Sequence, residues 1–239
     1  MFYALPRSEI VSREQYVLEA CRGKRVIHLG AAQGSDSNDL AEYNSTVDPR
    51  TFLHTRITAV ASRCVGIDYN EFFVQYLKDT FQIDNILCGN IEDARAMARI
   101  DLAADVIVMG EIIEHISNPG LALSNIRDNL MRDSTKLLVT MPNALDASNF
   151  LYGLFRSESH DPDHVAMYTP RLFDKLCQRV NLRVVDLVYY QSTISTNGWN
   201  YYTLDRCTPR KLILCAYYNL LLRLNPGFSN GLIAVAIRT

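Results

Sequence analysis

Short apolar runs alternate along this chain with longer stretches of helical periodicity, and this alternation is the feature that most constrains the fold. Strand-like runs cover residues 25–29, 64–67, 85–88, 105–109 and 136–141. Helical patterns cover residues 13–21, 49–62, 71–80, 120–130 and 170–180. Because strands that alternate with helices are typical of βαβ units, the pattern predicts an α/β protein with a mostly parallel sheet.

The length of 239 residues fits one α/β domain, which we expect to span residues 1–239. The pattern loosens after the fifth strand. Residues 144–170 and 191–225 are irregular, and we expect them to form a small helical cap and to contribute to a substrate pocket. A polar stretch at residues 35–48 is predicted to be a loop. Residues 183–190 are predicted to be a further strand, and residues 232–237 are predicted to be the last strand.

The composition argues against several classes of protein. A net charge of −2 and a pI of about 6.2 disfavour a nucleic-acid partner, which a basic face would bind. The six cysteines contain no CxxC pair, so we expect reduced core thiols and a cytoplasmic protein. The chain begins without a signal-peptide pattern, and the apolar residues 212–224 are too few to span a bilayer, so no transmembrane segment is expected.

The first strand leads into a turn of small residues, Gly30-Ala31-Ala32-Gln33-Gly34. Small side chains allow a ligand to lie directly against the backbone. The spacing Gly-x-Ala-x-Gly differs from the GxGxxG of a dinucleotide fingerprint. A glycine turn after a strand is also common in α/β proteins generally, so this motif alone does not establish a ligand site.

The second and third strands end in polar residues. Asp68 follows the second strand, where a carboxylate can accept hydrogen bonds from both hydroxyls of a ribose. Alternatively, Asp68 caps the helix that begins near Asn70. Asn90 and Ile91 follow the third strand, where the amide could meet an adenine amine while Ile91 packs on the ring. The alternative there is an ordinary strand-to-helix turn.

The most specific stretch of the chain follows the fourth strand and reads Gly110-Glu111-Ile112-Ile113-Glu114-His115. The fifth strand ends in Pro142-Asn143, and a later box reads Asp163-His164-Val165-Ala166-Met167-Tyr168-Thr169-Pro170. Together with the two earlier turns, and in this order, these segments resemble class I S-adenosylmethionine-dependent methyltransferases. The closest likeness is to the group that includes the ubiquinone-biosynthesis and sugar O-methyltransferases, and it covers roughly residues 26–190.

The resemblance implies a Rossmann-like class I methyltransferase sheet with helices on both faces, an antiparallel last strand and a small helical cap. It implies S-adenosylmethionine as the cofactor and S-adenosylhomocysteine as its product, bound at the carboxyl ends of the first four strands. The cofactor-binding residues that it implies are Gly30, Ala31, Ala32, Gly34, Asp68, Tyr69, Asn90, Ile91, Gly110, Glu111 and His115.

Two positions depart from the first motif of that family. His28 stands where the family usually has an acid, and Ala32 stands where it has a middle glycine. The acid often supports the amino group of the cofactor, so that contact is in question here. His54 and Arg56 are candidates to approach the carboxylate of the cofactor, and the alternative is that they are exposed helix residues.

Methyl transfer requires an acceptor atom in line with the sulfur–methyl bond, and a hydroxyl acceptor benefits from a base. His164 is the first candidate for the base because a neutral imidazole suits pH 7. Asp163 could orient His164 or bind substrate, and His115 could contact substrate or cofactor. The histidines and acids at 160–164 also offer metal ligands, but Pro162 stiffens the loop and no second ligand cluster has clear spacing, so no metal is expected. The remaining alternative is a structural loop.

The sequence therefore favours methyl transfer to a small-molecule acceptor, with an oxygen of a sugar, glycan precursor or related metabolite as the preferred target. A degenerate methyltransferase fold that only binds and an N-methyltransferase are the alternatives. A nucleotide-dependent oxidoreductase would share Asp68 but would not require Glu111-Ile112-Ile113-Glu114-His115. Residues 150–155 and 197–202, with Trp199, are candidate acceptor walls or packing segments. No nucleic-acid partner is expected, and the oligomeric state is open, with a homodimer as one possibility.

Overall fold

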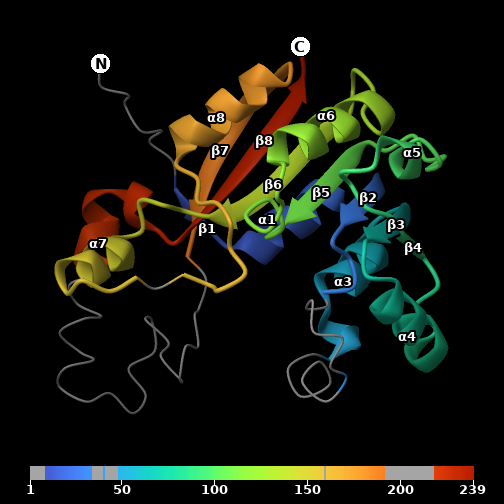
Figure 1. Cartoon of the computed structure of the whole chain (residues 1–239), viewed down its shortest axis with the longest axis horizontal. Coiled ribbons are helices and arrows are strands. Elements are labelled where there is room, and N and C mark those ends of the chain that lie inside the picture. The colour runs from blue at the N-terminus through green and yellow to red at the C-terminus, as the bar shows by residue number, and fades with distance from the viewer. Residues whose placement is uncertain (1–8, 34–39, 41–47, 159, 192–217) are drawn as a thin grey trace.

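The computed structural model describes residues 9–33, 40, 48–158, 160–191 and 218–239. Its described residues form an eight-stranded sheet in the order β1-β7-β8-β6-β5-β2-β3-β4 (Figure 1). The strands are β1 (Ile10–Val11), β2 (Arg25–Leu29), β3 (Arg63–Asp68), β4 (Ile86–Cys88), β5 (Val106–Gly110), β6 (Lys136–Pro142), β7 (Leu182–Tyr190) and β8 (Gly231–Arg238). The predictions for Gly34, for most of residues 35–48 and 191–225, and for Trp199 lie outside the described residues.

The pairing of the strands confirms the predicted sheet. All neighbouring pairs are parallel except those of β8, which runs antiparallel to both β6 and β7. The carboxyl ends of β2, β3, β4 and β5 therefore meet along one edge of the sheet. In open α/β sheets this edge is where ligands bind.

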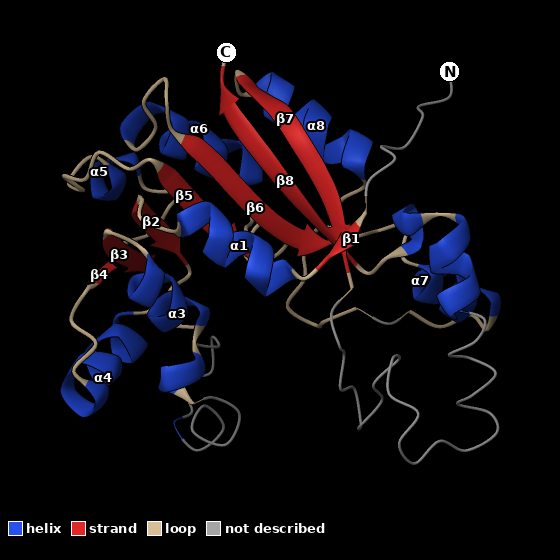
Figure 2. Cartoon of the chain, turned by 180° about the vertical axis from the view of Figure 1, so that it is seen from behind, coloured by secondary structure: helices blue, strands red, loops and turns tan. Residues whose placement is uncertain are grey.

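Helices cover both faces of the sheet, as predicted. The helices are α1 (Arg13–Cys21), α3 (Leu53–Val60), α4 (Glu71–Phe81), α5 (Ala94–Met97), α6 (Pro119–Asn129), α7 (Ala147–Leu154) and α8 (Pro170–Arg179), with 3₁₀ turns at Pro49–Thr51 and Pro226–Phe228. Helices α6 and α8 lie in front of the sheet in Figure 1, whereas α1 and α3 lie in front of it in Figure 2, the view from behind.

Alternate residues of the central strands face the two layers of helices. Along β5, Ile107 and Met109 belong to the core that holds α6 and α8, whereas Val106 and Val108 belong to the core that holds α1 and α3. Both faces of a parallel sheet are buried, which explains why this strand is a continuous apolar run in the sequence.

Helix boundaries follow the local capping chemistry. Ser12 caps α1, and its hydroxyl accepts a hydrogen bond from the Gln15 N–H. Asn118 and Thr169 cap α6 and α8, each of which has a proline in its first turn. The helix predicted at 49–62 is instead a 3₁₀ turn followed by α3, which starts at Leu53.

Three elements were not predicted: β1, α5 and α7. The first two contain only two and four residues, too few to show a period. Helix α7 lies beside the β1 end of the sheet and packs through Ala147 against Tyr218 and Leu222 of the helical residues 218–224 (Figure 1). Helix α7 falls within residues 144–170, from which a small helical cap was expected without helix bounds.

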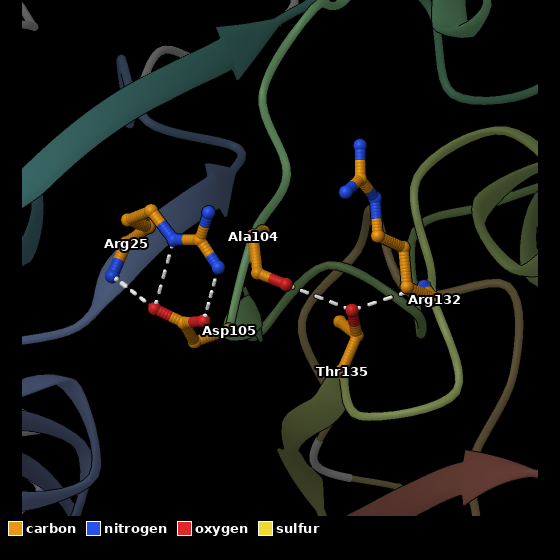
Figure 3. Close-up of polar contacts among 5 residues, drawn as sticks. All are labelled: Arg25, Ala104, Asp105, Arg132 and Thr135. Atoms are coloured by element: carbon orange, nitrogen blue, oxygen red, sulfur yellow. Dashed lines mark hydrogen bonds and ion pairs between the residues drawn. The ribbon is translucent and has the colours of Figure 1, made fainter.

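The end of the sheet opposite the ligand edge is fixed by polar contacts (Figure 3). The Arg25 guanidinium donates to both carboxylate oxygens of Asp105, at 2.6 and 3.1 Å, which joins the start of β2 to the residue before β5. The buried Thr135 hydroxyl donates to the Ala104 carbonyl at 2.8 Å and accepts the Arg132 backbone N–H at 3.0 Å. These contacts join the segments that lead into β2, β5 and β6.

Cysteine environments only partly match the sequence prediction. Cys21, Cys64 and Cys177 are free buried thiols, and burial raises the pKa of each. Cys88 is also free but is exposed, contrary to the expectation of core thiols. Over the described ranges, none of the helices combines the length and apolar character needed to cross a bilayer.

Candidate active site

A cavity of about 590 Å³ lies at the carboxyl ends of β2, β3, β4 and β5. Eight of the predicted cofactor residues line it: Gly30, Asp68, Tyr69, Asn90, Ile91, Gly110, Glu111 and His115. The lining also contains residues that the sequence did not single out: Arg13, Gln33, Ile67, Gly89, Glu92, Ile112, Ile116 and Ser117. The structure thus brings most of the predicted cofactor residues to one place.

The turn after β2 brings backbone to the cavity wall. Gly30 has φ +70°, and its N–H donates to the Ile67 carbonyl at 2.8 Å. A Cβ at this position would lie 2.5 Å from Cδ1 of Ile112, so any larger residue would have a strained backbone and would have to displace the Ile112 side chain. Ala31 and Ala32 are fully buried, and their side chains pack in the core that includes Phe73 instead of lining the cavity.

Asp68 is held at the cavity edge by backbone donors. Its two carboxylate oxygens accept the Ala32 N–H at 2.8 Å and the Asn70 N–H at 3.0 Å. Asn70 is the residue that caps α4, through a hydrogen bond from the Phe73 N–H, so the alternative in which Asp68 caps this helix is wrong. Burial raises the pKa of Asp68, and the backbone hydrogen bonds partly offset that shift.

The turn after β4 is fixed by a chain of hydrogen bonds. The Asn90 side-chain oxygen accepts the Glu92 N–H at 2.9 Å, and the Glu92 carboxylate accepts the Asn118 N–H at 2.9 Å. The Asn125 amide donates to the Ile91 carbonyl at 3.0 Å. These contacts with α6 and its N-cap fix the turn that carries Asn90 and Ile91. The two residues give the cavity wall one polar and one apolar side chain.

The end of β5 carries a partly buried polar network that the sequence did not reveal. Glu111 adopts φ +55°, and one oxygen of its carboxylate accepts the Tyr190 hydroxyl at 2.7 Å and the Thr140 hydroxyl at 2.8 Å. Arg13, from α1, donates to the Thr140 hydroxyl at 3.0 Å and lies 3.8 Å from the Glu111 carboxylate. Burial, with the Glu111 charge as a further cause, raises the pKa of Tyr190, which therefore stays a hydrogen-bond donor.

The predicted catalytic residues lie beyond Glu111. His115 lines the cavity, and its Nδ1 is 3.2 Å from the backbone oxygen of Asp163, which also lines the cavity. The His115 and His164 rings meet edge to face with centroids 4.7 Å apart. His164 lines a second cavity, of about 530 Å³, together with His160 and Asp161. Burial lowers the pKa of His164, so its imidazole is neutral near pH 7.

Glu114 is a further residue of this region that sequence reasoning did not include as a site residue. Its side chain is buried, and neither carboxylate oxygen has a hydrogen-bond partner. Burial, with the charge of Glu111 as the next cause, raises its pKa to about 8. The Val165 N–H donates to the Glu114 backbone oxygen at 2.8 Å, which draws the His164 loop against the end of β5.

His28, which departs from the family's first motif, does not line the cavity. His28 is buried, and its Nδ1 lies 3.4 Å from Nδ1 of His54, with the two rings stacked. Burial lowers the pKa of both histidines. Arg56 forms an ion pair with Glu14. The suggestion that His54 and Arg56 approach a cofactor carboxylate is therefore wrong, and His54 is a core residue, not an exposed one.

Comparisons with known proteins agree with this geometry. A family model described as a methyltransferase domain matches residues 9–187. A probable S-adenosylmethionine-dependent methyltransferase of Mycolicibacterium smegmatis (strain ATCC 700084 / mc(2)155) is 25% identical over 146 residues, which are 61% of this chain and 48% of that protein. The chain thus spans about half the length of this curated relative.

Solved structures share the fold at low sequence identity. A SAM-dependent methyltransferase from Archaeoglobus fulgidus superposes with a TM-score of 0.57 at 13% identity, over 95% of this chain and 91% of that one. The magnesium protoporphyrin IX methyltransferase of Synechocystis PCC 6803, solved with bound SAH, gives a TM-score of 0.53 at 11% identity, over 95% and 82%. At these identities the likeness concerns the fold.

Proposed function

Because this chain belongs to the methyltransferase-domain family and has the class I, S-adenosylmethionine-dependent fold, we propose that it transfers a methyl group from S-adenosylmethionine to a small acceptor. The observation that carries the proposal is the position of Asp68. Its carboxylate ends β3 beside the glycine turn of β2, at the edge of a cavity large enough for a nucleoside.

The residues of the cavity fit this cofactor. Asp68 would accept hydrogen bonds from the ribose hydroxyls, because its carboxylate lines the cavity and a carboxylate has about four acceptor sites. Asn90 and Ile91 would hold the adenine by hydrogen bonding and by packing. Gly30 allows the ligand to lie against the backbone, and Arg13 adds a positive charge that suits the carboxylate of the amino-acid part. When bound, the cofactor supplies a methyl group already activated by its sulfonium.

The acceptor site is proposed to be the second cavity, next to His115 and His164. Its lining includes His160, His164 and Asp161, which are groups that can hydrogen-bond to hydroxyls. This polar lining supports a hydroxylated acceptor, and a sugar, glycan precursor or related metabolite has the required chemistry. The net charge of −2 supports a small molecule over a nucleic acid.

The acceptor must lose a proton when its oxygen gains the methyl group. His164 is proposed as the base because it lines the acceptor cavity and its lowered pKa keeps the imidazole neutral. His115 lies between the two cavities and would position the acceptor oxygen near the methyl group. Asp163 supports His115 through its backbone oxygen.

The test has two steps. The purified chain is titrated with S-adenosylhomocysteine by calorimetry, and micromolar binding at one site is expected. Methyl-labelled S-adenosylmethionine is then incubated with sugar nucleotides and glycosides that carry free hydroxyls, with aromatic hydroxyl and amine compounds as the comparison set. Labelled sugar products support the proposal. Labelled amines would replace it with N-methylation, and the absence of cofactor binding would replace it with a degenerate binding module.

A further inference from the structure

Glu114, His115 and His164 converge between the two cavities although they come from two distant segments. Each offers one ligand atom, and these atoms all lie within 4.8 Å of one another. The hydrogen bonds from Val165 and Ala166 N–H groups to the Glu114 backbone oxygen, at 2.8 and 3.2 Å, join the two segments. The convergence is therefore fixed by backbone contacts and does not depend on side-chain rotamers alone.

The buried carboxylate of Glu114 lacks the partner that its environment requires. The residue is 1% exposed, and both of its carboxylate oxygens are buried without a hydrogen bond. Nδ1 of His164 is likewise buried without a partner. Buried polar groups in native proteins are nearly always hydrogen-bonded, and buried charges are paired or bind metals. A cation placed between these atoms would satisfy both residues at once.

We propose that Glu114, His115 and His164 form a binding site for a divalent transition-metal ion, with Zn²⁺ as the best match. Two imidazoles and one carboxylate are a ligand set used by catalytic zinc and by other first-row metals. Around one Zn²⁺, ligand atoms lie about 3.4 Å apart at the usual bond lengths. The ligand atoms, which lie within 4.8 Å of one another, would thus need to approach one another by about 1.4 Å at most.

A hydrogen bond that would orient His115 toward the metal is already in place. A metal-bound histidine usually donates its other ring N–H to a carbonyl or carboxylate, which fixes its tautomer. His115 Nδ1 lies 3.2 Å from the backbone oxygen of Asp163, and this contact leaves Nε2 for the metal. Three protein ligands leave at least one coordination position open, between the cofactor cavity and the second cavity.

The open position suggests what the metal does, and this step rests on the proposed function. An acceptor hydroxyl bound to the metal would lose its proton to water more readily, because a cation lowers the pKa of the oxygen that it binds. The oxygen would then bond to the methyl group as the sulfur–methyl bond breaks. With His164 as a metal ligand, the metal replaces the histidine base of the simpler mechanism.

The site is tested on the full chain after treatment with a chelator and dialysis. Calorimetric titration with ZnCl₂ is expected to show one equivalent bound, and Glu114→Gln and His164→Ala are each expected to weaken binding at least about tenfold. His160→Ala is the matched control, because this histidine lies in the same loop but outside the cluster. Its Zn²⁺ affinity should equal that of the parent.

X-ray absorption of the Zn²⁺-loaded parent protein provides a measurement that no substitution can disturb. It should show imidazole nitrogen and carboxylate oxygen ligands, whereas sulfur ligands or an absence of binding would overturn the site. Unchanged Zn²⁺ affinity in both Glu114→Gln and His164→Ala would also overturn it. Titration of each protein with S-adenosylhomocysteine separates the two proposals: cofactor binding without Zn²⁺ binding overturns the metal site alone, and the reverse result overturns the proposed function alone.

Discussion

The carboxylate of Asp68 accepts a hydrogen bond of 2.8 Å from the backbone N–H of Ala32, and this bond ties the end of β3 to the turn after β2. Ala32 is the position where related methyltransferases have a glycine. Its side chain is fully buried in the core with Phe73 and does not enter the cavity. The alanine therefore preserves the backbone donor that orients Asp68, and the departure leaves the proposed ribose contact intact.

Replacing Asp68 with alanine should weaken S-adenosylhomocysteine binding at least about tenfold, because a charge-assisted pair of hydrogen bonds is lost. Calorimetric titration measures the dissociation constant. Asp79→Ala is the matched control, since Asp79 is exposed on α4, outside the cavity lining, and accepts hydrogen bonds from the Gln75 amide on the same helix. A folded Asp68→Ala protein that binds as tightly as the Asp79→Ala control would contradict the assignment.

Gly23 and Gly30 have similar backbone conformations, so alanine variants at the two positions distinguish the effect of backbone strain from the effect of a lost cavity contact. Gly30 and Gly23 have φ of +70° and +66°, so alanine at either should lower the free energy of unfolding by about 1–2 kcal/mol. Only Gly30→Ala also displaces Ile112, a cavity residue whose Cδ1 would lie 2.5 Å from the new Cβ. Nothing lies within 4 Å of a Cβ at Gly23.

The expected result is therefore two destabilised proteins, with Gly30→Ala at least as destabilised as Gly23→Ala because of its overlap with Ile112, and only Gly30→Ala has lost affinity for S-adenosylhomocysteine. Denaturant unfolding and calorimetric titration of both variants provide the comparison. Equal loss of affinity in both would show that strain, not the contact with Ile112, controls the cavity.

Local signals made much of the fold predictable. The predicted bounds of the first helix and the first strand agree with α1 and β2, because a serine cap and a buried apolar run act over a few residues. The antiparallel last strand followed from the family resemblance and is present as β8. The position of Asp68 and Gly110 at the cavity was predictable because each residue ends a parallel strand. The carboxyl ends of parallel strands meet at one edge of the sheet.

The parts that escaped prediction depend on contacts between distant segments. Arg13 reaches the cavity because α1 packs across β5 and β6, and nothing around residue 13 in the sequence indicates this. Glu114 lies close to His164 because the Val165 and Ala166 N–H groups bond to its backbone oxygen, and these segments are about fifty residues apart in the sequence. His54 was a candidate to approach a cofactor carboxylate because it follows the loop at residues 35–48, but its ring packs against His28 in the core.

The hydroxyl of Tyr190 should support both stability and cofactor binding through Glu111. Tyr190→Phe removes the donor that lies 2.7 Å from the Glu111 carboxylate, and we expect a loss of about 1–2 kcal/mol in the free energy of unfolding. A weaker S-adenosylhomocysteine complex should accompany it, because Glu111 lines the cavity. Urea unfolding and titration measure the two effects. Tyr152→Phe, at an exposed position on α7, should change neither, and equal results for the two variants would refute the role of Tyr190.

The pair formed by Arg25 and Asp105 should make stability depend on pH in a defined window. The Arg25 hydrogen bond lowers the pKa of Asp105 from 3.8 to about 2 in the folded protein. The ionised carboxylate therefore stabilises the fold in full above the unfolded pKa, and this stabilisation is lost as the pH falls through the folded pKa. Because both side chains are partly exposed, solvent screens the pair, and Asp105→Asn should lower the thermal midpoint by only about 1–3 °C at pH 7.

The difference in midpoint between parent and Asp105→Asn should stay constant from pH 7 to about pH 5 and shrink from about pH 4 towards pH 2. Thermal unfolding followed by circular dichroism at each pH measures it. Asp133→Asn, at an exposed position near the start of β6, is the control for removing one carboxylate, and its midpoint should follow the parent throughout. The pair at the amino end of β5 lies opposite the ligand edge of the sheet, so S-adenosylhomocysteine affinity should not change in Asp105→Asn. A difference that grows as the pH falls would mean that Asp105 is not held in its ionised form by Arg25.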